Sequence, residues 1–267
     1  LTVDQIISLI IVFISLLLTI FLLTAKTKNA ISNIFLALFL LANAQDSSGL
    51  LASYLLYPTV PGWGMILNST VFFKMPLLYL YLLSVIYSDF KLRWIHLWHV
   101  LPWVLNFLVF MPRYYAVDFD AKWEFLSGNG YRENFEIQFS YIAVHIQITV
   151  YLVLSYFAIN KYRKLLLENF SNASLFNYKW LFQLITIIGV ESAFATLKNV
   201  FLFLNIETAY SYSKLFLSLF ALGFICWLVL KALHNPNLFR GVSSNLQLIK
   251  KIKLEKNLVK LIPDEID

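Results

Sequence analysis

Seven long apolar stretches follow one another along the chain, and they constrain its fold more than any other feature. A helix needs about 20 mostly apolar residues to cross about 30 Å of hydrocarbon. Of the 267 residues, 60% are hydrophobic and 13% are charged, whereas soluble domains have about 45–50% apolar and about 25% charged residues. The stretches are too long, and alternate too little, for membrane β-strands. We predict an all-α polytopic membrane protein, a bundle of about seven transmembrane helices. The expected spans are 5–24, 30–57, 63–87, 94–112, 137–160, 178–204 and 211–234.

Basic residues in the loops predict the orientation, because cytoplasmic loops carry an excess of Lys and Arg. Alternate loops hold 15 of the 21 basic residues. These are Lys26, Lys28, Lys91, Arg93, Lys161, Arg163, Lys164, Lys179, Lys231, Arg240, Lys250, Lys251, Lys253, Lys256 and Lys260. The opposite loops hold only Arg113, Lys122 and Arg132, all three in the longest loop, 113–136. We therefore expect the N-terminus outside, the C-terminus inside, and a multi-pass location in a bacterial inner membrane.

Several ionisable or strongly polar residues fall inside the expected spans. Such residues are costly in hydrocarbon and are therefore candidates for function. The candidate ligand-binding residues are Asp46, Lys74, His145, Gln147, Glu191 and Lys198. Their estimated depths place them in the outer half of the bilayer. Asp46 is expected to face Lys74, and Glu191 and Lys198, seven residues apart, share one helical face.

Three interpretations of this polar cluster stay open. Paired charges can tie helices together without binding anything. An outward-facing pocket for a small ligand would use the same residues. Proton or ion conduction would favour a chain of carboxylates across the whole membrane, and the inner half lacks one.

Motifs for catalysis or for cofactors are missing from the sequence. It contains no HExxH, GxSxG, Walker or GxGxxG motif, and its single cysteine, Cys226, forms no intramolecular disulfide. His96 and His99 lie three apart with no third ligand nearby, which favours packing over a metal site. Lys214 and Lys231 lie too near the ends of the last span for a retinal lysine. We expect no enzyme activity, no metal and no cofactor.

A series of short motifs follows in a fixed order. It comprises Pro76-Leu77-Leu78-Tyr79-Leu80-Tyr81, Ser84, Asp89-Phe90-Lys91-Leu92, His99-Val100-Leu101-Pro102, Phe170-Ser171-Asn172, Lys179-Trp180-Leu181 and the exit from Lys231 through Asn235-Pro236-Asn237-Leu238-Phe239-Arg240-Gly241. Over residues 30–241 this order resembles a Bacteroidetes-type family in which a multi-helix membrane sensor precedes a cytoplasmic AraC-type helix-turn-helix DNA-binding domain. The departure is that only 26 residues follow Gly241, too few for that domain.

The resemblance implies that residues 1–241 are a transmembrane sensor domain and that 242–267 form a basic cytoplasmic linker to a further domain. The sensor would detect a small ligand or envelope signal from the outer side and pass it to a DNA-binding output. DNA would be contacted only through that domain, and a homodimer is an expectation by analogy. A histidine-kinase sensor and a small transporter or channel are the alternatives. The tail at 242–262 is expected to be either a coupling helix or a solvated linker.

Overall fold

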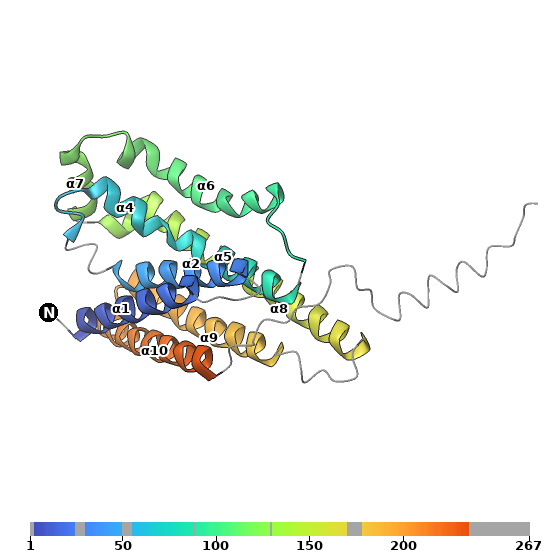
Figure 1. The fold of residues 1–267 in the computed structure, drawn as a ribbon. Helices are drawn as coiled ribbons and strands as arrows, with labels where there is room; N and C mark the ends of the chain where they lie inside the picture. The colour runs from blue at the N-terminus through green and yellow to red at the C-terminus, as the bar shows by residue number, and fades with distance from the viewer. Residues whose placement is uncertain are drawn as a thin grey trace, which may run out of the picture.

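The computed structural model describes residues 3–24, 30–49, 55–87, 89–128, 130–169 and 178–234, which contain helices and no β-strand (Figure 1). The longer helices are α1 (Val3–Thr24), α2 (Ala30–Ser47), α5 (Val71–Ile86), α6 (Leu101–Phe110), α8 (Phe135–Asn169), α9 (Tyr178–Phe203) and α10 (Glu207–His234). The shorter ones are α4 (Pro61–Ser69), η1 (Trp94–Val100), η2 (Met111–Tyr115), α7 (Phe119–Ser127) and η3 (Tyr131–Glu133). The predicted tail at 242–267 lies outside the described residues, as do the motifs at 170–172 and 235–241.

Six helical segments within the described residues are long and apolar enough to cross a membrane. They are Val3–Thr24, Pro61–Ile86, Trp94–Tyr115, Phe135–Glu168, Tyr178–Phe203 and Glu207–Lys231. The chain is therefore an all-helical, multi-pass membrane protein. The remaining expected span corresponds to α2, which is shorter than these six segments.

Several predicted boundaries are wrong, each for a local reason. α2 ends at Ser47, where the polar run from Gln45 to Ser48 interrupts the apolar sequence, and residues 50–54 of the expected span 30–57 lie outside the described residues. Helix α8 has 35 residues, about 52 Å at 1.5 Å per residue, and thus extends well beyond the predicted 137–160. Helix α10 begins at Glu207, four residues before the predicted start.

The stretch 113–136, predicted as a loop, contains ordered helices. Helix α7 starts at Asp118, whose carboxylate accepts a hydrogen bond of 3.0 Å from the Ala121 amide, the usual N-cap arrangement. Tyr114 donates to the Pro61 carbonyl at 2.7 Å and so joins this region to α4. A separate apolar cluster of Met65, Phe110, Tyr114, Phe125 and Ile137 holds it together.

The long helices form a closed ring. Neighbouring pairs are α1 with α2, α2 with α5, α5 with α8, α8 with α9, α9 with α10, and α10 with α1. Helix α6 lies outside this ring, where it packs mainly on α8 (Figure 1). The main apolar core is drawn from all six ring helices, and it fixes the positions of the polar side chains described next.

Candidate functional site

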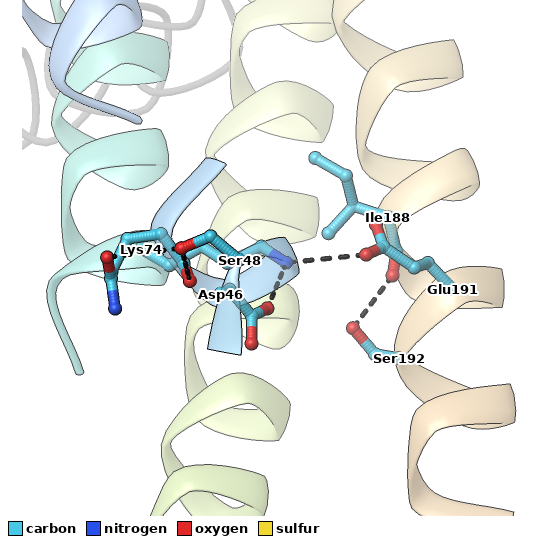
Figure 2. Close-up of polar contacts among 7 residues, drawn as sticks. Asp46, Ser48, Lys74, Ile188, Glu191 and Ser192 are labelled. Carbon is cyan, nitrogen blue, oxygen red and sulfur yellow. Dashed lines mark hydrogen bonds and ion pairs between the residues drawn. The ribbon is translucent and has the colours of Figure 1, made fainter. Parts of the chain in front are cut away.

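Lys74 lies at the centre of the intramembrane charges. Its Nζ lies 2.9 Å from Oδ2 of Asp46 and 3.3 Å from Oε1 of Glu191. Figure 2 shows the ammonium between the two carboxylates, which come from α2 and α9. The predicted pairing of Asp46 with Lys74 is confirmed, and Glu191 completes a three-helix ion cluster.

The helix boundaries account for this meeting of charges. Asp46 is the penultimate residue of α2, and Lys74 lies in the first turn of α5, the next long helix in the ring. Asp46, in the last turn of α2, thus meets Lys74 near the middle of the apolar helical segment Pro61–Ile86. Glu191 is reached across the ring from α9.

Exposure differs within the ion cluster. The side chains of Lys74 and Glu191 are 11% and 14% exposed, whereas that of Asp46 is 44% exposed. A buried ammonium is tolerable only with compensating charge, and two carboxylates supply it here. Asp46 has the most exposed side chain of the three.

His145 and Lys198 extend the cluster toward the ends of α8 and α9. The His145 ring contacts Thr196 Oγ1 at 3.1 Å through Nδ1 and Asn199 Nδ2 at 2.7 Å through Nε2. Lys198 is half-buried and interacts electrostatically with Asp46, Lys74 and Lys214. With Lys198 included, the four charged candidates balance to zero formal charge.

Gln147 has a structural contact that the sequence did not indicate. Pro76, inside α5, has no N–H to donate to the Phe72 carbonyl four residues earlier. Gln147 Nε2, from α8, donates to that carbonyl at 3.0 Å and is itself buried. The glutamine therefore replaces the missing helical hydrogen bond and joins α8 to α5.

One further ion pair was missed. Lys214 Nζ of α10 lies 3.5 Å from Oδ2 of Asp4 in α1. Asp4 escaped notice because it precedes the expected first span, although an acidic residue there is the natural partner for a lysine at the start of the last helix. With this pair, every ring helix contributes an ionisable side chain: Asp4, Asp46, Lys74, His145, Glu191 and Lys198, and Lys214.

Some polar atoms near these charges are buried without a hydrogen-bond partner among the described residues. They include Glu191 Oε2, Gln45 Nε2 and Asn199 Oδ1. Buried polar atoms are almost always paired with protein groups or ordered water. A site with unpaired donors and acceptors suits a polar ligand or water better than a purely structural salt bridge does.

The loops at the same end as the cluster are held by buried polar and aromatic groups. Arg113 Nη1 lies 3.2 Å from Oε2 of the buried Glu136. Burial raises the pKa of Tyr57 to about 12, and burial also raises the pKa of Tyr131. Both phenols stay neutral near pH 7, so they add hydrogen-bonding groups without adding charge.

The histidine pair near the start of α6 does not form a metal site with other ligands. His96 Nδ1 accepts from the Arg93 amide at 2.8 Å, and His99 Nδ1 pairs with the Tyr151 hydroxyl of α8. No group of three or more His, Cys, Asp or Glu side chains suited to a metal ion occurs within the described ranges. Hydrogen bonds and ring packing account for both histidines.

No protein-family model, curated protein or solved structure matches the chain. The arrangement of charges in the ring is therefore the main basis for a functional proposal.

Proposed function

We propose that the chain is a membrane-embedded sensor domain that binds a small polar ligand from the outer side and passes the signal to a cytoplasmic DNA-binding output. One observation carries the ligand site: Lys74 is shared between Asp46 and Glu191 while Asp46 remains 44% exposed. A ligand that pairs with the Asp46 carboxylate would weaken the ion pair between Asp46 and Lys74, and Lys74 would then be paired mainly with Glu191. Because these residues belong to α2, α5 and α9, the change would reach three helices together.

The proposal includes seven spans, with α2 as the second. Eighteen residues of α2 extend about 27 Å at 1.5 Å per residue, close to the hydrocarbon thickness of about 30 Å. Its place between α1 and α5 in the ring supports a crossing. Seven spans and the distribution of basic residues together support an outer N-terminus and an inner C-terminus.

Topology is tested with two reporter insertions. A cytoplasmic reporter fused after residue 241 is expected to be active, and a reporter inserted near residue 128, after α7, is expected to be active only outside the cytoplasm. If both reporters lie on the same side of the membrane, the chain between residues 128 and 241 crosses it an even number of times. That outcome would reject the seven-span arrangement.

The resemblance of the ordered motifs to AraC-type membrane regulators supports a transcriptional output. The test is made in the organism that carries the gene, by comparing transcripts in the wild type, a deletion strain and a strain with Asp46→Asn. We expect Asp46→Asn to reproduce transcript changes of the deletion while the protein stays in the membrane at the wild-type level. The matched control is Asp120→Asn, the same substitution at an exposed aspartate of α7. It should leave transcript levels as they are in the wild type.

Other outcomes separate the alternatives. If the deletion changes no transcripts, the regulator proposal is wrong. Phosphoryl transfer from ATP by the complete protein would instead support a histidine-kinase sensor. Solute flux through purified protein in liposomes would support a transporter or channel, for which the described residues offer no further specific observation.

A further inference from the structure

A cavity of about 230 Å³ lies where the short helix η3 faces the turn between α9 and α10. It is smaller than the roughly 300–1,000 Å³ typical of sites for drug-sized ligands. Its size suits a molecule of a few heavy atoms. Its polar lining comes from Arg132, Asn205, Glu207, Tyr210 and Ser211, and Leu202 contributes apolar surface.

The turn that forms one wall has a defined backbone. Asn205 adopts a left-handed conformation with φ of 56°, which asparagine tolerates better than most residues. The Ile206 amide donates to the Phe201 carbonyl at 3.0 Å, and the Tyr210 amide donates to the Ile206 carbonyl at 2.9 Å. These bonds hold the side chain of Asn205 and the first turn of α10 beside the same cavity.

Two side chains of opposite charge, Arg132 and Glu207, line the cavity. Arg132 and Glu207 are exposed, and neither forms an ion pair within the described part of the chain. Arg113, the other arginine of this region, is instead paired with the buried Glu136. Arg113 therefore stabilises the fold, whereas Arg132 is free to recognise a ligand.

Tyr141 of α8 contacts the end of α9 next to the cavity. Its ring packs edge-to-face against Phe203, with centroids 5.3 Å apart. On α9, Glu191 and Lys198 are spaced by seven residues and share one face, and Asn205 follows two residues after the end of that helix. The contact of Tyr141 with Phe203 thus joins α8 to the end of α9 beside the cavity.

We infer that this cavity binds a small zwitterion of the size of a free amino acid, with its carboxylate on Arg132 and its ammonium group on Glu207. A guanidinium binds a carboxylate through two parallel hydrogen bonds, and the hydroxyls and the amide of the lining suit the remaining polar atoms. The inference goes beyond the proposed site at Asp46, because it names a second site and the class of ligand that this second site takes. Opposite charges in one small cavity favour a zwitterion over a simple anion.

The test uses the full chain in lipid nanodiscs and the standard L-amino acids, added one at a time. Thermal unfolding followed by tryptophan fluorescence identifies binders, and calorimetry gives their affinities. We expect one or a few amino acids to raise the melting temperature. Their methyl esters and N-acetyl derivatives should fail to do so, because each derivative removes one of the two charges.

Variants locate the site. Arg132→Gln and Glu207→Gln should each weaken binding about tenfold or more, the loss of a charge-assisted hydrogen bond. The matched controls are Lys91→Gln, an exposed cation after α5, and Glu133→Gln, an exposed neighbour of Arg132 outside the cavity lining. Both controls should bind as the wild type does.

Three results would overturn the inference: no amino acid binds, both derivatives bind as well as the parent compound, or Arg132→Gln leaves affinity unchanged. The derivatives are tested on the wild-type protein, so the outcome does not depend on any variant folding. Binding that requires Asp46 but not Arg132 would reject this cavity and leave the sensor proposal standing. Binding that requires Arg132 without any change in transcripts would reject the sensor proposal and leave the cavity site standing.

Discussion

Helices α2 and α6 belong to one membrane protein but differ in composition and surroundings. Ten of the 18 residues of α2 are buried, among them Ser32, Asn33 and Asn43. In α6 only Asn106 and Phe110 are buried, and the preceding η1 has no buried residue. Helix α6 instead exposes large apolar side chains such as Leu105 and Leu108.

This contrast follows from the solvent. Lipid is as apolar as leucine, so an apolar helix gains little by leaving it, and helices associate through packing and polar contacts. Helix α2 is a member of the ring between α1 and α5 and buries polar side chains, whereas the apolar α6 lies outside the ring (Figure 1). The buried polar side chains of α2 therefore face protein. An apolar sequence does not by itself place a helix outside, because the apolar α1 is also a ring helix.

The largest effect is expected from Lys74→Met, which removes the cation that joins α2 to α5 and α9. Breaking a buried ion pair by deleting one partner costs about 3–5 kcal/mol, and here two carboxylates lose their partner. The free energy of unfolding, measured by titrating SDS into mixed micelles, should therefore fall by about 3–5 kcal/mol. Adding Asp46→Asn should recover part of the loss.

Lys91→Met is the control for that experiment, because Lys91 is exposed and lies outside the ring interior. It should leave stability nearly unchanged. A cost for Lys74→Met below about 1 kcal/mol, the range of surface ion pairs, would contradict the view that this cluster holds α2 in the ring.

Phe39→Ala tests how much apolar packing, without any change of charge, contributes to holding α2 in the ring. Phe39 is fully buried, and the change leaves a cavity of roughly 100 Å³, whose cavity term at about 24 cal/mol per Å³ is about 2 kcal/mol. The transfer term does not apply, because lipid is itself apolar. The same SDS titration measures the loss. A cost near zero would show that lipid fills the space, and α2 would then be no more enclosed than α6.

Gln147→Leu is expected to cost about 1–2 kcal/mol, because it leaves the buried Phe72 carbonyl without a donor. Pro76→Ala restores an N–H four residues after Phe72, so in that background Gln147→Leu should cost much less. The double-mutant cycle measures this coupling. Equal costs in both backgrounds would mean that Gln147 does not compensate for Pro76.

The sequence was sufficient to predict the helical membrane class and the meeting of Asp46 with Lys74, because hydropathy and paired charges are local signals. It did not predict that 113–136 contains helices, since these depend on how short segments pack against α4 and α8. The pairing of Gln147 with Phe72 depends on the register between α5 and α8. Similarly, the pairing of Asp4 with Lys214 requires α10 to return beside α1.

The smallest effect is expected from Leu105→Ala in α6. Leu105 is 47% exposed, and if that surface contacts lipid, the smaller side chain leaves no protein cavity, because acyl chains fill the space. The free energy of unfolding should then change by no more than about 0.5 kcal/mol, as for surface substitutions in general. Phe39→Ala in α2 is the comparison, and both variants are measured in the same micelles. A loss for Leu105→Ala as large as that for Phe39→Ala would mean that α6 packs against protein in the membrane. A second copy of the chain would be the first partner to examine, by measuring the molecular mass of wild type and variant in the same detergent.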